Sequence, residues 1–228
     1  MTEVNRSSYL SNLIKGKLIF KISIIIKDTQ SNIYIMGEKF KTLEGSAEEQ
    51  SVAVILSTSL GDIELVVYPQ KAPLSAGDFL NYVDRGLYQG AAFYRVVRPD
   101  NDNSSPVIEV IQGGLLTETP PTAPIAHETT QYTGIEHLDG TISLARREVG
   151  SATAAAFFIA IGDQPSMNFG GSRNPDKQGF AAFVHVAKGM EVVRAIQQIR
   201  DTSSYNDSDM KDQILSNPII IESVKRKN

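Results

Sequence analysis

The sequence contains no cysteine and no tryptophan among its 228 residues. The absence of cysteine excludes a disulfide framework, thiolate zinc sites, iron–sulfur clusters and a cysteine nucleophile. No run of about 18 apolar residues occurs, so the sequence predicts no helix that spans a membrane. An excess of basic residues is also missing, since 22 Lys and Arg stand against 26 Asp and Glu. This mildly acidic balance argues against nonspecific binding of nucleic acid, which requires a basic surface.

The remaining composition is that of an ordinary globular protein, with 41% hydrophobic and 21% charged residues. A chain of this length can bury a substantial core without disulfides. We expect an N-terminal extension over residues 1–50 and one folded domain over residues 51–228. The boundary follows residues 44–50, whose small and charged side chains are typical of a linker.

The first fifty residues allow two interpretations. Residues 18–26 (LIFKISIII) are apolar apart from Lys21 and Ser23 and follow several basic residues, as in a signal peptide. The charge on Lys21, however, interrupts the apolar centre that such a peptide needs. The other interpretation is a poorly ordered extension or a pair of strands. We therefore expect a cytoplasmic protein, with a periplasmic location as the alternative if this segment acts as a leader.

Beyond residue 50 the sequence predicts a series of short strands. The runs 52–58 and 63–68 are joined by a turn that contains Gly61, which is typical of a hairpin. Six further runs of apolar and β-branched residues follow at 92–97, 107–112, 140–145, 156–161, 181–186 and 218–224. Eight strands are enough for a sheet to close on itself and to fill its own interior with side chains.

Two segments are predicted to be helical instead. The first begins at Pro73 and ends near Gly86, and Ser75 and Asp78 have the spacing of a capping box. The second runs from about residue 189 to residue 199 and carries apolar side chains on one face. Eight strands and two helices together predict a closed barrel with a helix over each open end.

Several short motifs, in a fixed order, identify a family. They include GDIEL (61–65), DFLNYV (78–83), FYRVV (93–97), QGG (112–114), FFI (157–159) and GFAAF (179–183). In this order they resemble the cyclophilin family of peptidyl-prolyl cis–trans isomerases, and the resemblance covers about residues 51–200. It implies a mainly β fold, a closed eight-stranded antiparallel barrel capped by two α-helices, in agreement with the pattern above. It also implies catalysis without a cofactor and without a metal.

The reaction of this family requires a fixed hydrogen-bond donor. Rotation about an X-Pro bond is slow because the amide has double-bond character, with a barrier of about 18–20 kcal/mol. In the twisted amide the imide nitrogen gains a basic lone pair, so a donor aimed at it stabilises that state selectively. The resemblance assigns this role to Arg95, whose guanidinium stays protonated. Strand alternation predicts that Arg95 and Tyr94 point to opposite faces.

The resemblance also assigns the residues that surround the substrate. Gln112 is expected to orient Arg95 and to contact the substrate backbone. Phe158 is expected to form the floor of a proline pocket, whereas Phe157, on the other face of the strand, is expected to pack inside the barrel. The remaining substrate-binding positions of the family correspond to Val110, Met167, Ala145, Arg146, Phe180, Glu109 and Ala156.

Several of these positions depart from the family pattern. Glu109 and Ser166 each stand where the family usually has an aromatic residue. Val110 replaces a methionine, Ala156 replaces a glutamine, and Phe180 replaces a histidine or tyrosine. We therefore expect isomerase activity that is retained but weak or narrow.

The segment between Arg95 and Gln112 is longer than in the family. Its extra residues, 98–106, are polar and typical of a loop. A buried and unpaired carboxylate is costly, so we expect Glu109 either to face solvent or to pair with Arg95 or Arg146.

The expected partners are proline-containing peptides and unfolded or folding proteins, bound by a monomer. Nucleic acid is not an expected partner, and no membrane span is expected. A metal is not expected, because the three histidines, at 127, 137 and 185, are far apart in the sequence. The alternative function is a binding module that captures proline-containing segments as a chaperone, with little or no turnover. A comparison of isomerisation rates with and without Arg95 discriminates between the two functions.

Overall fold

The computed structural model describes residues 4–14, 17–27, 33–42, 50–203 and 210–227. The chain divides into two compact units, residues 1–48 and 49–228. The first unit contains an antiparallel sheet of β1 (Val4–Ile14), β2 (Lys17–Lys27) and β3 (Ile33–Thr42), with β2 in the middle. The predicted linker lies outside the described residues, apart from Gln50.

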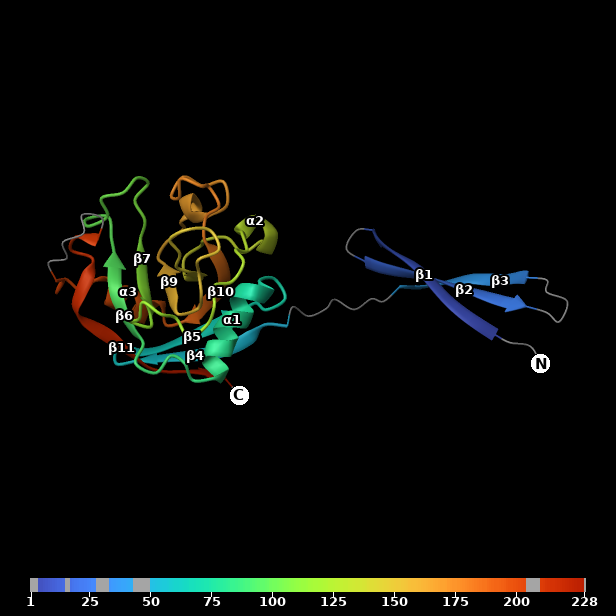
Figure 1. Ribbon diagram of the computed structural model, residues 1–228, viewed down its shortest axis with the longest axis horizontal. Coiled ribbons are helices and arrows are strands. Elements are labelled where there is room, and N and C mark those ends of the chain that lie inside the picture. Colours follow the sequence, from blue (N-terminus) through green and yellow to red (C-terminus); the bar gives the residue numbers. More distant parts are fainter. Residues whose placement is uncertain (1–3, 15–16, 28–32, 43–49, 204–209, 228) are drawn as a thin grey trace. The chain divides into compact units, whose positions relative to one another are not determined.

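The second unit is a closed β-barrel whose neighbouring strands are antiparallel (Figure 1). The order around the barrel is β10-β5-β4-β11-β6-β7-β9-β8. The strands are β4 (Val52–Thr58), β5 (Gly61–Val67), β6 (Ala92–Val97), β7 (Val110–Gly114), β8 (Thr141–Leu144), β9 (Ala156–Ala160), β10 (Ala181–Lys188) and β11 (Ile214–Arg226). The predicted fold class and all eight predicted strands are confirmed.

Only β4 and β6 have the predicted boundaries, and the largest differences occur at the starts of β11 and β7. Strand β11 begins at Ile214 rather than at Pro218, and its register shifts between Ile214 and Ile219. This irregularity accommodates Pro218, which has no backbone N–H to donate to a neighbouring strand. Strand β7 begins at Val110 rather than at Val107, because the extra loop before it extends further than its polar residues indicate.

The barrel interior follows from strict alternation along β4 and β5. In both strands every second residue is buried, and the two strands pair from Val52 opposite Val67 to Thr58 opposite Gly61, as the hairpin prediction requires. The largest side chains inside are aromatic, among them Phe93, Phe157 and Phe183, all without solvent exposure. Burial of this apolar surface is the main force that stabilises the barrel.

Helices α1 (Pro73–Asp84) and α3 (Met190–Gln197) are the two predicted helices, and a short α2 (Thr130–Thr133) was not predicted. Helix α1 adds Phe79 and Tyr82 to the barrel core, and α3 adds Val193 and Ile196. A single 3-10 turn, Pro165–Met167, precedes β10. Within the part of the chain that the structure describes, the helices are too short or too polar to cross a bilayer.

The predicted capping box at the start of α1 is wrong. The Ser75 backbone N–H and hydroxyl both donate to Glu128, each at 2.7 Å, and the Leu74 N–H donates to the same carboxylate at 3.1 Å. The Asp78 carboxylate instead accepts from the Ala154 N–H at 2.7 Å. A carboxylate at the positive end of a helix is favourable wherever it comes from in the sequence. The cap is therefore a tertiary contact rather than a local one.

Candidate active site

Three predicted site residues lie in one row across neighbouring strands. Arg95 on β6 lies opposite Gln112 on β7, and Gln112 lies opposite Phe158 on β9. Directly opposed residues of antiparallel strands point to the same face. Ile111 and Phe157, the sequence neighbours of Gln112 and Phe158, belong to the barrel core. The row Arg95–Gln112–Phe158 therefore faces outward.

A β-bulge in β6 turns Arg95 toward this outer face. Phe93 and Val96 are both fully buried in the barrel core, although regular alternation would place them on opposite faces. The register with β7 shifts between Phe93 and Arg95, so Tyr94 is the additional residue. The Tyr94 hydroxyl accepts a hydrogen bond from the Gln112 side chain at 3.0 Å. The prediction that Tyr94 and Arg95 point to opposite faces is therefore wrong.

Two glutamine side chains fix the orientation of the Arg95 guanidinium. Its Nη1 donates to Gln112 Oε1 at 3.0 Å, while Nε and Nη2 donate to Gln213 Oε1 at 2.9 and 2.6 Å. Both acceptors are neutral amides, so these bonds hold the guanidinium without cancelling its charge. Gln112 was predicted to hold Arg95, whereas Gln213 lies in a polar segment without a motif and was not predicted.

An apolar cluster lies beside this row and is separate from the barrel interior. We call it the outer cluster; its members are Val97, Ile108, Val110, Phe158 and Met167, with Ala145 and Phe180 packed against them. The structure thus brings together five predicted substrate-binding residues: Val110, Phe158, Met167, Ala145 and Phe180. Ile108 and Val97 were not predicted. Val97 carried a usable signal, since it lies two positions beyond Arg95 on the same strand.

Phe180 and Arg146 form one wall of the outer cluster. The Phe180 ring meets Phe158 edge to face, with centroids 5.0 Å apart, and the Arg146 guanidinium lies 5.4 Å from the centre of the Phe180 ring. Arg146 also makes two 2.8 Å bonds to Asp176, which lower the pKa of Asp176 to about 2. The Arg146 side chain, held by Asp176, therefore packs against the Phe180 ring and helps to fix its position.

The two remaining predicted residues lie at the margin of the site. The Glu109 carboxylate accepts a hydrogen bond from the Gln197 side chain at 3.0 Å, a partner on α3 that the sequence did not indicate. Ala156 is half-buried at the start of β9, and its carbonyl accepts from the Ala145 N–H at 2.9 Å. This bond fixes the edge next to the outer cluster.

A buried histidine supports the floor of the site. His137 stacks on Phe158, with centroids 6.1 Å apart and an interplanar angle of 16°. Its Nδ1 lies 2.7 Å from Asn168 Oδ1 and its Nε2 lies 2.8 Å from Ser143 Oγ. Because an amide oxygen can only accept, Nδ1 carries the proton and Nε2 accepts from Ser143. Burial lowers the pKa of His137 to about 4, which keeps the ring neutral. An isolated histidine gave no signal of this role in the sequence.

The extra loop after Arg95 is tied to the rest of the site. The Asp102 carboxylate accepts from Arg173 Nη1 and from the Ile108 N–H, each at 2.9 Å. Arg173 also donates to the Pro106 carbonyl at 2.7 Å. Burial alone raises the pKa of Asp102, but these bonds hold it below its usual value. The loop thus places Ile108 in the outer cluster. Its bonds to Arg173 join it to the segment that follows Met167.

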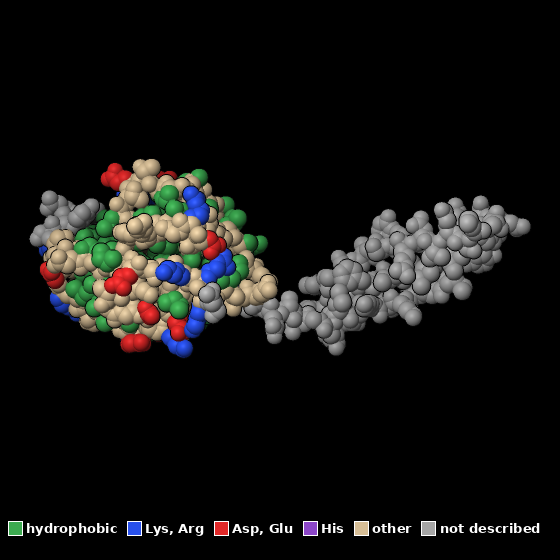
Figure 2. Space-filling view, turned by 90° about the horizontal axis from the view of Figure 1, so that it is seen from below, with side chains coloured by type: hydrophobic (Ala, Val, Ile, Leu, Met, Phe, Trp, Pro, Cys, Tyr) green, Lys and Arg blue, Asp and Glu red, His purple; other side chains and the backbone are tan. Residues whose placement is uncertain are grey.

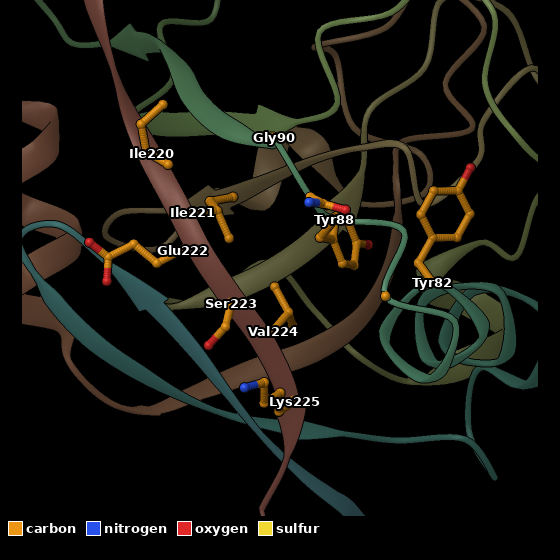
Figure 3. A pocket seen from close by; sticks show the side chains of 11 residues that line it. Tyr82, Tyr88, Gly90, Ile220, Ile221, Glu222, Ser223, Val224 and Lys225 are labelled. Carbon is orange, nitrogen blue, oxygen red and sulfur yellow. The ribbon is translucent and has the colours of Figure 1, made fainter.

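Other surface features lie outside this site. A cavity of about 430 Å³ is lined by Tyr82, Tyr88 and residues 220–225, and none of the site residues line it (Figure 3). On the face shown in Figure 2, basic and acidic side chains are interspersed rather than separated into patches. Among residues 50–203 and 210–227, no three His, Asp or Glu side chains come together as metal ligands.

A closed eight-stranded barrel with an outward row of arginine, glutamine and phenylalanine defines a cyclophilin-type domain. The family model described as "Cyclophilin type peptidyl-prolyl cis-trans isomerase/CLD" matches residues 53–226. The chain therefore belongs to the cyclophilin family of peptidyl-prolyl cis–trans isomerases, as the motifs predicted.

Curated relatives and a solved structure agree with this family. The chain is 34% identical over 184 residues to peptidyl-prolyl cis-trans isomerase A of Dickeya dadantii, covering 78% of this chain and 86% of that protein. It is 29% identical over 175 residues to peptidyl-prolyl cis-trans isomerase B of Escherichia coli, covering 75% and 97%. A crystal structure of a Cryptosporidium parvum cyclophilin type isomerase shares the fold, with a TM-score of 0.58, 18% identity, and coverage of 78% of this chain and 99% of the other.

Proposed function

We propose that this chain accelerates the rotation of X-Pro bonds in peptides and folding proteins, with Arg95 as the hydrogen-bond donor to the imide nitrogen. The observation that carries the proposal is the register of β6, β7 and β9, which aligns Arg95, Gln112 and Phe158 on one outer face. The names of the curated relatives support the same reaction.

The geometry supplies both parts that the reaction needs. The outer cluster offers an apolar surface for the proline ring, and Arg95 lies in the same row as Phe158 at its floor. A donor that is already oriented loses little freedom when the amide twists, so its hydrogen bond favours the twisted amide over either planar form. A charge-assisted hydrogen bond of this kind stabilises the twisted state by about 1.5–3 kcal/mol. This equals a rate factor of roughly 10–150.

The test is the isomerisation rate of a short X-Pro peptide. We expect Arg95→Ala to lower kcat/KM by about tenfold or more, and Arg95→Lys to recover only part of the loss, because an ammonium cannot bind two glutamines in one plane. Arg226→Ala is the control, since Arg226 pairs with Asp84 on α1. Equal rates for the wild type and Arg95→Ala would instead support the chaperone module with little turnover.

The proposed substrates are proline-containing peptides and unfolded proteins, and the proposed acting species is a monomer. One chain contributes Arg95, Gln112 and Phe158 together, so a single copy supplies the whole row. Light scattering during size-exclusion chromatography tests the monomer, and a mass of two chains at micromolar concentration would contradict it.

The cytoplasmic location also stays a prediction, with a periplasmic location as its alternative. Fractionation of cells that express the full chain tests it, combined with mass spectrometry of the native N-terminus. Recovery in the periplasm, with the first residues removed, would support the alternative.

A further inference from the structure

The structure assigns a positioning role to Gln213: its side-chain oxygen sets the angle at which Arg95 presents its guanidinium to the substrate. This inference rests on the proposed function of Arg95. It adds a residue that lies 118 positions away in the sequence and outside the motifs that identified the family.

Gln213 contacts Arg95 directly through two hydrogen bonds. Gln213 Oε1 accepts from both Nε and Nη2 of Arg95, at 2.9 and 2.6 Å, and Gln213 has no solvent exposure. Nε and Nη2 form one edge of the planar guanidinium, so an oxygen bonded to both restricts the rotation of the group. Gln112 binds Nη1 at 3.0 Å, and the two amides thus hold the group at separate positions.

Gln213 is itself rigidly held. Its Nε2 donates to the Asn101 carbonyl at 2.7 Å, and its own carbonyl accepts from the Val96 N–H at 2.8 Å. The Asn101 side chain donates to the Val96 carbonyl at 3.2 Å and to the Asp212 carbonyl at 2.9 Å. The extra loop therefore fixes Gln213 beside β6, which gives this loop a function at the active site.

The choice of an amide is chemically specific. A carboxylate at this position would form an ion pair with Arg95 and reduce its positive potential toward the imide nitrogen. An aliphatic side chain would leave two half-buried guanidinium N–H groups without this acceptor and would allow the group to rotate. Glutamine supplies an acceptor without charge and a donor for Asn101 at the same time.

The test is a double-mutant cycle measured on a short X-Pro peptide. We expect Gln213→Met, which keeps the length but removes the acceptor, to lower kcat about tenfold while KM changes less than about twofold. In the Arg95→Ala background the same substitution is expected to change the rate less than about twofold. Ile63→Ala, which shortens a buried barrel side chain on β5, controls for lost stability. At temperatures well below its Tm, this variant is expected to have the wild-type kcat.

Two results would overturn the role of Gln213. One is a wild-type kcat for Gln213→Met; the other is an equal loss in both backgrounds, which indicates a purely structural role. If Arg95→Ala alone has the wild-type rate, the proposed function fails instead, and the two failures are distinguishable.

A second measurement needs no variant at position 213 and remains valid if Gln213→Met does not fold. The Arg95 Nε–H signal in a ¹H–¹⁵N spectrum, assigned by its loss in Arg95→Ala, is expected to exchange slowly with water. Fast exchange of this proton would contradict the contact.

Discussion

His137 lies face to face with Phe158, and its two ring nitrogens are both occupied by hydrogen bonds to Asn168 and Ser143. The floor of the outer cluster therefore rests on a neutral imidazole that has little access to solvent. Protonation of this ring would place an unpaired charge directly behind the apolar surface that is proposed to bind proline.

We expect the free energy of unfolding to decrease as the pH falls from 7 to 5. The pKa of His137 is lowered to about 4 in the folded state from 6.5, so the unfolded chain binds the proton first. The loss is about 2 kcal/mol by pH 5, where most carboxylates are still ionised in both states. Urea unfolding at several pH values measures it. A His137→Gln variant should show a flatter dependence, and an unchanged slope would contradict this origin.

Substitutions at the neighbouring residues Phe157 and Phe158 are expected to affect different properties, namely stability at Phe157 and substrate binding at Phe158. Phe157 is fully buried and packs edge to face against Phe79, Tyr88 and Phe93, so Phe157→Leu should lower the free energy of unfolding by about 1–3 kcal/mol. Phe158→Leu should raise KM for a proline peptide about tenfold. Denaturation curves and peptide kinetics on both variants provide the check. Parallel losses in both variants would mean that the two faces are not independent.

The ion pair between Asp102 and Arg173 is expected to be important for stability. Asp102→Asn leaves a largely buried guanidinium without its counter-charge, and we expect a loss of about 3 kcal/mol in the free energy of unfolding. Asp84→Asn is the matched control, because Asp84 and its partner Arg226 are both well exposed. A pair of this exposure contributes about 0–1 kcal/mol. Similar effects of the two substitutions in thermal unfolding would refute the prediction.

Substitution of alanine for two glycines is expected to change the free energy of unfolding in opposite directions. A Cβ at Gly113 would lie 2.7 Å from the Phe93 ring and 2.9 Å from the Ala92 carbonyl, so Gly113→Ala should destabilise the barrel by about 1–3 kcal/mol. A Cβ at Gly77, inside α1, meets nothing within 4 Å. Gly77→Ala should therefore stabilise the protein by about 0.5–1 kcal/mol. The midpoints of urea unfolding test both signs.

The sequence was sufficient for the barrel because alternation is a local property. Every second residue of β4 and β5 is buried, and all of these except Thr58 are apolar, while Gly61 marks the turn between the strands. The outer cluster was also largely predictable, since Phe158 and Phe180 stand in motifs of the family and Val110 stands two positions before one. The positions of these residues in the fold follow from the residues next to them in the sequence.

The positions that were missed depend on distant contacts. Gln213 and Glu128 act on Arg95 and on the start of α1, and neither lies near its partner in the chain. The bulge at Tyr94 was missed for a different reason. The motif FYRVV is compatible with regular alternation, and only the burial of both Phe93 and Val96 reveals the additional residue.

Inward and outward positions alternate along β7 and β9, so the barrel packing and the proposed substrate contacts involve different residues of the same strands. A library of variants confined to outward positions such as Val110, Ala156 and Phe158 would explore new peptide specificities while Ile111 and Phe157 preserve the scaffold. Engineering could therefore retune recognition here without first having to stabilise the protein.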